Sequence, residues 1–402
     1  MPDQARWPES EAMSSSLRLP NRAAPWLALL STLGVLIAGC ESDPGDEGTT
    51  RYTDSAGETL GDGDGDPSGD GDGEPAGDGD GEPAGDGDGE PAGDGDGEPA
   101  GDGDGDPTGD GDGDGDMGSV TEDGSLYTIS VDQFEMVVDA AAGARIVSFE
   151  IDGYETLVQM GAASQYGSTF WPSPQSWGWP PSMAVDTGPY VATLGDNSVS
   201  MVSADDFGFN IVVTKTFTPV PGEGIRVTYA MENIAGFDQN LAGWEITRLA
   251  GGLAFYEPGP AGVVREDGGS NFTSLVNGHR WYAYPQGGGD SKHFADGTGW
   301  LAGAIPAAIG GANLLVLKQF EDVAFEDFAS SNAGQEAEIE LYGAGNGTYY
   351  ELEQQGPAEA LTPGASSSWD VLWSGAVLDE GANFDAGSQD LLDAVAGLQT
   401  AP

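Results

Sequence analysis

The chain has 402 residues and carries 68 acidic and 12 basic side chains, which gives a formal net charge of −56 at pH 7. A chain this poor in Lys and Arg offers no surface for phosphates, so its composition excludes a nucleic-acid-binding protein. A single cysteine, Cys40, excludes an internal disulfide and a multi-cysteine zinc site. We expect neither a metal nor a cofactor.

Residues 1–40 have the pattern of a bacterial lipoprotein signal peptide. Arg18 and Arg22 precede an apolar run at 23–37, and two small residues then lead to Cys40. A basic start, a short apolar run and small residues before a cysteine are typical of such signals. The run is short for a transmembrane helix, and no basic stop follows it. An uncleaved signal anchor with an incidental cysteine is the alternative.

This pattern predicts that Cys40 becomes the lipidated first residue of the mature protein. Its acyl chains would hold the protein on a membrane of the bacterial cell envelope, while the rest of the chain stays in water. Glu41, rather than an aspartate, follows the cysteine. By analogy with well-studied bacteria, this residue favours the outer membrane.

Residues 41–118 form an acidic linker of low complexity. They hold 28 acidic side chains and one basic residue, Arg51, and from Gly61 to Asp116 an eight-residue unit such as GDGDGEPA repeats. Glycine removes backbone restraint, the acids repel one another, and nothing large and apolar can be buried, so we expect a disordered tether. Calcium binding by the alternating aspartates is the alternative, but the repeats lack apolar residues to build a rigid frame.

Residues 119–402 are expected to form one all-β domain. Alternating runs bounded by Gly, Asp, Asn and Pro predict antiparallel strands, at 145–151, 154–158, 210–217, 225–231, 241–249, 313–318, 336–341, 348–354 and 368–373. One C-terminal helix is predicted, capped by Ser388 and with an apolar stripe of Leu391, Leu392, Val395 and Leu398. Many strands and one late helix favour a large sandwich or barrel.

Residues 170–181 read FWPSPQSWGWPP, with three tryptophans among four prolines. Because proline is excluded from interior strands, we expect Trp171, Trp177 and Trp179 on a rigid loop. Flat indole faces can stack on a sugar ring, and Gln175 can bond its hydroxyls. The alternative is that the tryptophans anchor the loop as core residues.

Three charged residues lie within predicted strands that are otherwise largely apolar. Arg145 shares its parity with Val147 and two further apolar residues, so we expect it on an inner face, where it needs a ligand or an ion-pair partner. Glu245 and Arg248 are also candidate ligand-binding residues, although regular alternation would place them on opposite faces.

Paired carboxylates and histidines are the candidates for chemistry. Glu351 and Glu353 lie two residues apart on one predicted strand face, where each can shift the pKa of the other and suit one of them to acid–base work. A solvated outer face is the alternative. His279 and His293 lie in a Gly/Asp-rich stretch, where a catalytic role and a plain position on an exposed loop are both open.

Three segments together resemble the galactose mutarotase-like (aldose 1-epimerase-like) superfamily. They are MVVDAAAGARIVSFEIDGYETL at 136–157, VTYAMENIAG and AGWEITRLAGGLAFYEP within 227–258, and YYELEQQGPAEALTPGASSSWDVLW at 349–373. The 170–181 loop is similar to an uncharacterised domain-of-unknown-function branch. The resemblance spans most of 125–375. It implies an antiparallel β-supersandwich with a sugar-sized cleft on one concave face.

In true mutarotases a carboxylate takes the proton of the anomeric hydroxyl, and a histidine acts as the acid near the ring oxygen. The resemblance implies Glu353, or Glu351, as the base. It implies His279 as the acid by residue type alone. The histidines that the family carries on its middle strands have no match here, which favours binding without catalysis.

We therefore expect a membrane-anchored lipoprotein whose domain binds a neutral sugar or glycan. Residues 119–402 hold 37 acids and 8 bases, and this field repels anionic ligands. One alternative is an aldose 1-epimerase-type enzyme that uses a glutamate base. The other is a structural envelope lipoprotein without a ligand.

Overall fold

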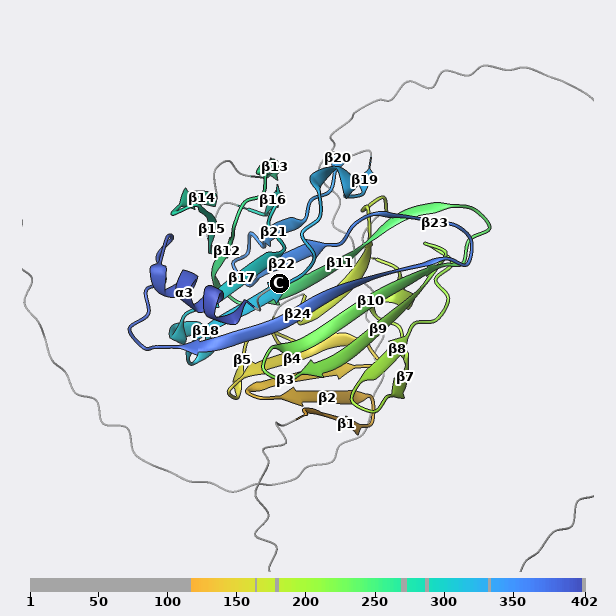
Figure 1. The fold of residues 1–402 in the computed structure, drawn as a ribbon, viewed down its shortest axis with the longest axis horizontal. Helices are drawn as coiled ribbons and strands as arrows, with labels where there is room; N and C mark the ends of the chain where they lie inside the picture. The colour runs from red at the N-terminus through yellow and green to blue at the C-terminus, as the bar shows by residue number, and fades with distance from the viewer. Residues whose placement is uncertain are drawn as a thin grey trace, which may run out of the picture. The chain divides into compact units, whose positions relative to one another are not determined.

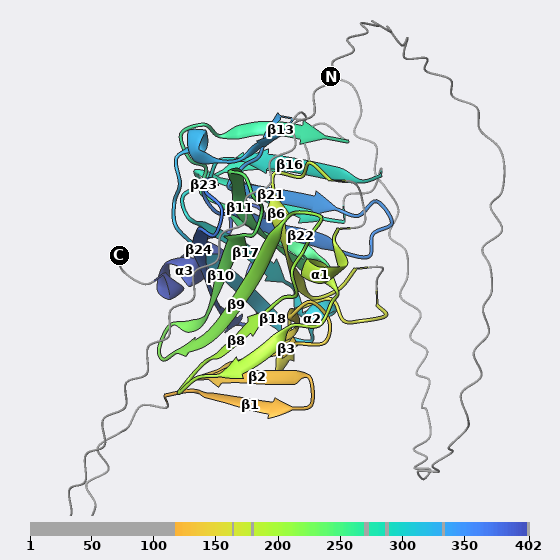
Figure 2. The ribbon, with the colours of Figure 1, turned by 90° about the vertical axis from the view of Figure 1, so that its right-hand side faces the viewer.

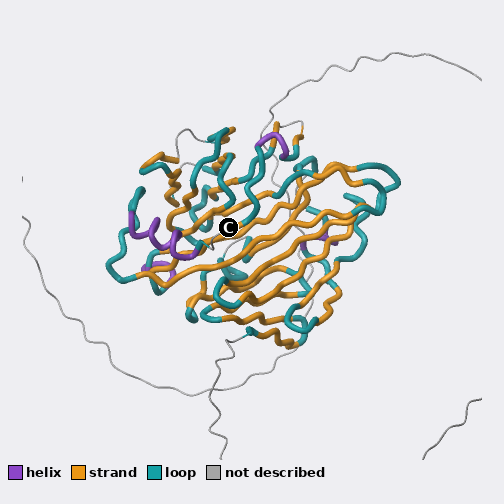
Figure 3. Tube along the Cα trace, viewed as in Figure 1, coloured by secondary structure: helices purple, strands orange, loops and turns teal. Residues whose placement is uncertain are grey.

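The computed structural model describes residues 117–162, 165–177, 181–268, 273–285, 289–331 and 334–399. The expected signal peptide with Cys40, the linker up to Asp116, and Trp179 lie outside the described residues. Strands dominate the part that is described (Figure 3). They form two large antiparallel sheets.

The first sheet has twelve strands and is called the twelve-stranded sheet below. Its strands are β1 (Ser119–Asp123), β2 (Leu126–Val131), β3 (Phe134–Asp139), β4 (Arg145–Ile151), β5 (Tyr154–Glu155), β6 (Ser168–Ser173), β11 (Gln239–Leu249), β13 (Val263–Asp267), β16 (Ser291–Ala295), β21 (Ile339–Gly343), β22 (Tyr350–Gln355) and β23 (Glu359–Leu361). The main order is β1-β2-β3-β4-β6-β11-β22-β21-β16-β13, with β5 beside β4 and β23 beside β11.

The second sheet has ten strands, in the order β14-β15-β12-β17-β18-β24-β10-β9-β8-β7. In chain order they are β7 (Val191–Leu194), β8 (Val199–Val202), β9 (Ile211–Val220), β10 (Gly224–Asn233), β12 (Gly252–Tyr256), β14 (Thr273–Val276), β15 (His279–Tyr284), β17 (Trp300–Ile305), β18 (Asn313–Gln319) and β24 (Ser366–Leu378). A small hairpin pairs β19 (Ser330–Ser331) with β20 (Gly334–Gln335).

The main hydrophobic core lies between the two sheets (Figures 1 and 2). Phe149 of β4 meets Trp373 of β24 edge to face, with ring centroids 5.1 Å apart. Phe170 of β6 stacks on Tyr229 of β10 at 4.5 Å. In each pair, one ring comes from the twelve-stranded sheet and the other from the ten-stranded sheet. Because alternate residues of a strand point to the same face, such rings fill the space between the sheets. This arrangement confirms the predicted all-β antiparallel sandwich.

The helices are α1 (Met183–Asp186), α2 (Ala307–Gly310) and α3 (Gln389–Leu398), with a 3₁₀ turn η1 (Phe325–Asp327). The predicted C-terminal helix is confirmed as α3, and the Ser388 Oγ accepts the N–H of Leu391 at 3.4 Å. α3 covers a second apolar cluster that includes Phe255 and Leu317 of the ten-stranded sheet. Within the described ranges, no helix is long and apolar enough to cross a membrane.

The proline-rich segment differs from the prediction, because its first part is the strand β6 rather than a loop. β6 pairs with β11 along its length, but with β4 only at Ser168. Pro172 therefore lies where β6 is paired on one side, and its missing N–H interrupts no second ladder.

The predicted direction of Arg145 is wrong, because β4 contains a β-bulge. Val137 of β3 pairs with Ser148, but Val138 pairs with Ile146, so one residue of β4 is left over between them. An extra residue shifts the alternation of side chains by one position. Ile146 consequently enters the core, and Arg145 points to the opposite face.

Candidate functional site

A cavity of about 620 Å³ opens on the outer face of the twelve-stranded sheet, the face turned away from the ten-stranded sheet. Aromatic side chains line it, namely Trp171, Trp244, Phe294, Tyr342 and Tyr349. Five acids line it as well, namely Asp267, Glu336, Glu340, Glu351 and Glu353. Gln165, Gln175, Arg265 and Lys292 complete the described lining. Apolar walls with a few convergent polar groups are typical of small-molecule sites.

Strand alternation on β22 builds the floor of the cavity. Tyr350 and Leu352 point into the core between the sheets, so Glu351 and Glu353 point to the cavity. The sequence predicted this common face. The two carboxylates are not solvated, because their residues are 8% and 0% exposed.

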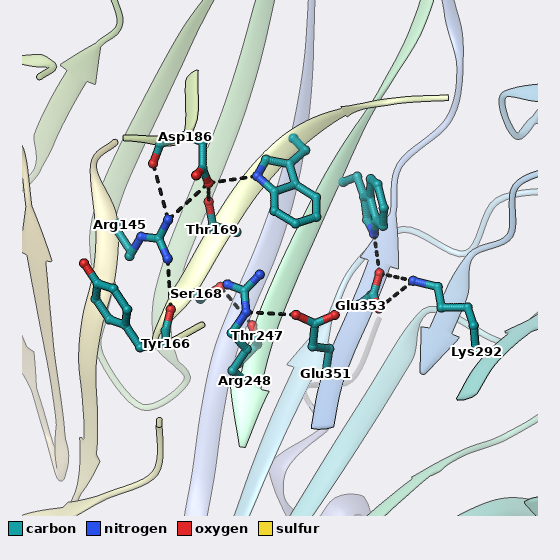
Figure 4. A network of polar contacts seen from close by, with 12 residues as sticks. Arg145, Tyr166, Ser168, Thr169, Asp186, Thr247, Arg248, Lys292, Glu351 and Glu353 are labelled. Atoms are coloured by element: carbon teal, nitrogen blue, oxygen red, sulfur yellow. Dashed lines mark hydrogen bonds and ion pairs between the residues drawn. The ribbon is translucent and has the colours of Figure 1, made fainter. Parts of the chain in front are cut away.

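Glu353 is held by an indole from the adjacent strand β11 and by a lysine from β16, which lies two strands away in the same sheet (Figure 4). Lys292 Nζ lies 2.6 Å from Glu353 Oε1, and Trp244 Nε1 donates to Glu353 Oε2 at 2.9 Å. Burial raises the pKa of Glu353 to about 8, against the opposing effect of Lys292. Burial lowers the pKa of Lys292, but Glu340 and Glu353 outweigh it and raise that pKa above its ordinary value.

Glu351 is paired with Arg248 of β11. Arg248 Nε donates to Glu351 Oε1 at 2.8 Å, and the arginine is 0% exposed. Its guanidinium carbon lies 5.7 Å from the ring centroid of Trp171. Arg248 therefore lies directly behind two residues of the cavity wall.

Arg145 forms a buried ion pair beside the cavity. It is not among the described residues that line the cavity. Asp186 of α1 accepts from the Arg145 guanidinium at 3.1 Å, from Thr169 Oγ1 at 2.7 Å and from Trp171 Nε1 at 2.8 Å (Figure 4). The arginine also donates to the Tyr166 carbonyl at 3.1 Å. Arg145 and Asp186 thus fix the position of the Trp171 indole. Of the two roles that the sequence left open for Arg145, ligand binding or an ion pair, the structure shows the ion pair.

Trp171 and Trp177, the two tryptophans of the 170–181 segment that the structure describes, pack against each other and against other aromatic rings. Trp171 meets Trp244 and Trp177 edge to face, with centroids 5.3 and 5.6 Å apart, and Trp177 also meets Phe209 at 5.8 Å. Trp171 lines the cavity, but Trp177 does not. Gln175 is exposed at the rim, and its backbone N–H donates to Glu336 Oε1 at 3.3 Å.

Two candidates from the sequence lie away from the cavity. Glu245 is fully buried between the sheets, where its Oε1 accepts from Lys318 Nζ and from Gln354 Nε2, each at 2.6 Å. It therefore points away from Arg248, as regular alternation predicts. His279 lies on β15 of the ten-stranded sheet, with its ring centroid 5.8 Å from that of Trp300, in the region that α3 covers. The structure brings neither residue to Glu353.

Most cavity residues escaped the sequence analysis, among them the charged residues Arg265, Asp267, Lys292, Glu336 and Glu340. Glu336 is 6% exposed, and burial, with a smaller effect of Glu340, raises its pKa to about 7. The stretch Glu336-Ala-Glu-Ile-Glu340 places an acid at every second position of a predicted strand. That pattern was the available signal, since a strand face of carboxylates needs either solvent or a counter-charge.

No metal centre is evident in the part of the chain that the structure describes. No three His, Cys, Asp or Glu side chains there are grouped so that they could hold a metal ion. The described cavity can thus offer aromatic faces, carboxylate acceptors and two cationic donors to a ligand.

Comparison with known proteins gives structural matches alone. No protein-family model matches the chain, and no curated protein matches it. The structure is similar to a galactose mutarotase-like protein from Lactobacillus casei, with 13% identity and a TM-score of 0.45 over 62% of this chain and 100% of the other. It is also similar to one from Clostridium acetobutylicum, with 9% identity and a TM-score of 0.42 over 63% and 95% of the two chains.

Proposed function

We propose that the cavity on the twelve-stranded sheet binds a neutral carbohydrate, without catalysis. One observation carries the proposal, namely that aromatic rings and buried carboxylates line the same hollow. Aromatic faces suit the C–H face of a sugar ring, and carboxylates accept hydrogen bonds from its hydroxyls. Five acids against two bases in the described lining repel an anionic ligand.

Titration of the full chain with neutral sugars tests this proposal. We expect a saturable change in tryptophan fluorescence with glucose, galactose, mannose or their oligosaccharides, and matching heats in calorimetry. Trp171→Phe alters the cavity wall and should weaken binding. Trp300→Phe is the matched control, because Trp300 packs in the cluster under α3 and should leave the affinity unchanged. Absence of saturable binding to every sugar would favour the structural alternative without a ligand.

Aldose 1-epimerase-type activity is the second candidate, and the cavity carboxyls favour it. Burial raises the pKa of Glu336 to about 7 and that of Glu353 to about 8, and groups that titrate near neutrality suit proton transfer. Polarimetry with freshly dissolved α-glucose or α-galactose separates the two functions. A binding protein leaves the rate at that of buffer, whereas an enzyme accelerates it and loses about 100-fold or more on Glu353→Gln.

We further propose that Cys40 carries the lipid that anchors the protein in the bacterial envelope, with the outer membrane favoured. The basic, apolar and small-residue pattern of residues 1–40 supports this, and the acidic linker then serves as a tether. Expression in a bacterium with labelled palmitate should label the protein, and Cys40→Ser should abolish the label. Labelling that persists in Cys40→Ser contradicts the anchor.

A further inference from the structure

Glu336 is a buried carboxyl group in the wall of the cavity that has no cation of its own. The residue is 6% exposed, and it lines the cavity. Its Oε1 accepts the backbone N–H of Gln175 at 3.3 Å. Within the described ranges, the side chain forms no other hydrogen bond and no ion pair.

Each of the other acids in the described lining lies against a basic side chain. The ion pairs are Asp267 with Arg265, Glu340 and Glu353 with Lys292, and Glu351 with Arg248. A buried carboxylate normally needs such a partner. Glu336 therefore differs from its neighbours in lacking a counter-charge from the described part of the chain.

The second carboxylate oxygen of Glu336, Oε2, is accessible from the cavity. It has no hydrogen-bond partner, and it is not one of the unpaired side-chain atoms that the described residues enclose completely. Since Glu336 is almost wholly buried but lines the cavity, the cavity is the open space that Oε2 faces. A ligand in the cavity can thus reach this acceptor directly.

The environment of Glu336 disfavours an uncompensated negative charge. Burial, with a smaller effect of Glu340, raises the pKa of the Glu336 carboxyl to about 7, although Lys292 and Arg265 act in the opposite direction. A cation placed beside Glu336 would stabilise the ionised carboxylate. The carboxyl group is therefore suited to a ligand that brings a positive charge.

The wall of the cavity is also suited to cations. Lys292 Nζ lies 5.1 Å from the ring centroid of Trp244, and the guanidinium carbon of Arg265 lies 3.7 Å from that of Phe294. Aromatic faces attract cations, so the walls favour positive charge. Five acids against two bases in the described lining attract a cationic ligand as well.

We propose that the cavity selects an amino sugar, and that Glu336 binds its ammonium group. The inference rests on the proposed sugar-binding function and extends the ligands from neutral sugars to their amino derivatives. The ammonium group donates a hydrogen bond to Glu336 Oε2, and the C–H face of the sugar ring lies on the aromatic wall. A hydroxyl in the same place would also donate to Oε2, but it would leave the buried charge uncompensated.

The test compares ligands and variants in parallel on the full-length protein at pH 7. Calorimetry measures the affinities for methyl glucoside, methyl galactoside and methyl mannoside, for their monoamino analogues at each ring position, and for the uncharged N-acetyl derivatives of these amines. Glu336→Gln keeps the size of the side chain and removes its charge. Glu135→Gln is the matched control, because Glu135 is exposed on β3 of the same sheet and lies outside the described lining.

For the wild type we expect the amine at one ring position to bind roughly ten- to hundredfold more tightly than the parent glycoside and the N-acetyl derivative. Glu336→Gln should bind the amine and the parent alike, and Glu135→Gln should behave as the wild type. If Glu336→Gln does not fold, Glu336→Asp answers the same question. It withdraws the charge by one methylene group and should reduce the gain from the amine.

The failures are distinguishable. A wild-type protein that binds neither neutral nor amino glycosides overturns the proposed function, and the ammonium site with it. A wild-type protein that binds neutral glycosides at least as tightly as every amino analogue overturns the ammonium site alone. A gain from the amine that persists unchanged in the Glu336 variant also overturns the assignment to Glu336.

Discussion

Glu340 and Glu353 lie directly opposite each other on the adjacent strands β21 and β22. Like charges in this position destabilise a sheet. Lys292 offsets the repulsion, because its Nζ lies 2.8 Å from Glu340 Oε2 and 2.6 Å from Glu353 Oε1. One lysine thus compensates two buried carboxylates at the centre of the candidate site.

Replacing Lys292 should lower the free energy of unfolding by more than the loss of a surface ion pair would. Lys292→Met leaves Glu353 buried without its cation, so we expect a loss of about 3–5 kcal/mol in the free energy of unfolding at pH 9, above the pKa of about 8 to which burial raises the Glu353 carboxyl. Urea unfolding measures the loss. The double variant Lys292→Met/Glu353→Gln should recover part of the stability, because it removes the stranded charge. A double variant less stable than the single variant would contradict this account.

Glu245 should act in stability and not in ligand binding. Its carboxylate joins the two sheets through Lys318 at 2.6 Å and through the hydroxyl of Tyr229. Glu245→Gln leaves Lys318 uncompensated in the core, and we expect a loss of about 3–5 kcal/mol. Sugar affinity per folded molecule should stay at the wild-type value. A weakened affinity at full folding would place Glu245 in the ligand site after all.

His279 should be dispensable for both candidate functions. It lies on β15 of the other sheet, and its Nδ1 is 2.9 Å from the Asn277 carbonyl. His279→Ala should change the free energy of unfolding by about 0.5–1 kcal/mol at most, with sugar affinity and any mutarotation rate unaltered. A rate that falls in this variant would restore His279 as the acid.

Titration of Glu336 should make the folded protein less stable as pH rises. Its pKa is raised from 4.5 to about 7, chiefly by burial. Between these values the folded protein holds a proton that the unfolded chain has released, so the free energy of unfolding falls with rising pH across this window and the contribution levels off above about pH 7. Glu336→Gln does not titrate, so its unfolding free energy should fall less between pH 5 and pH 8 in urea titrations. Parallel curves for variant and wild type would show that Glu336 has an ordinary pKa in the folded protein.

Features that depend on neighbours in the chain could be predicted from the sequence. The alternation of Glu351 and Glu353 against Tyr350 and Leu352 requires nothing beyond an extended backbone. The Ser388 cap and the stripe of α3 depend on residues within three or four positions. These predictions hold because the forces that produce them act within one strand or one helical turn.

Features that depend on a partner strand could not be predicted in the same way. The bulge that turns Arg145 outward exists because of the register between β3 and β4. The strand β6 forms through Pro172 because β4 pairs with it only at Ser168. Neither register is encoded in the local pattern of a single segment, since a shift of one residue reverses every side chain of a strand.

The amino-acid order was sufficient for the sandwich and for the common face of the two β22 carboxylates. Which charged residues form ion pairs depends on how the strands pair and how the two sheets pack. Lys292 reaches Glu353 across two strand boundaries, Arg248 reaches Glu351 across one, and Lys318 reaches Glu245 from the opposite sheet. Compensation of buried charge is a property of contacts between strands distant in the chain, and only their packing brings such groups within hydrogen-bonding distance.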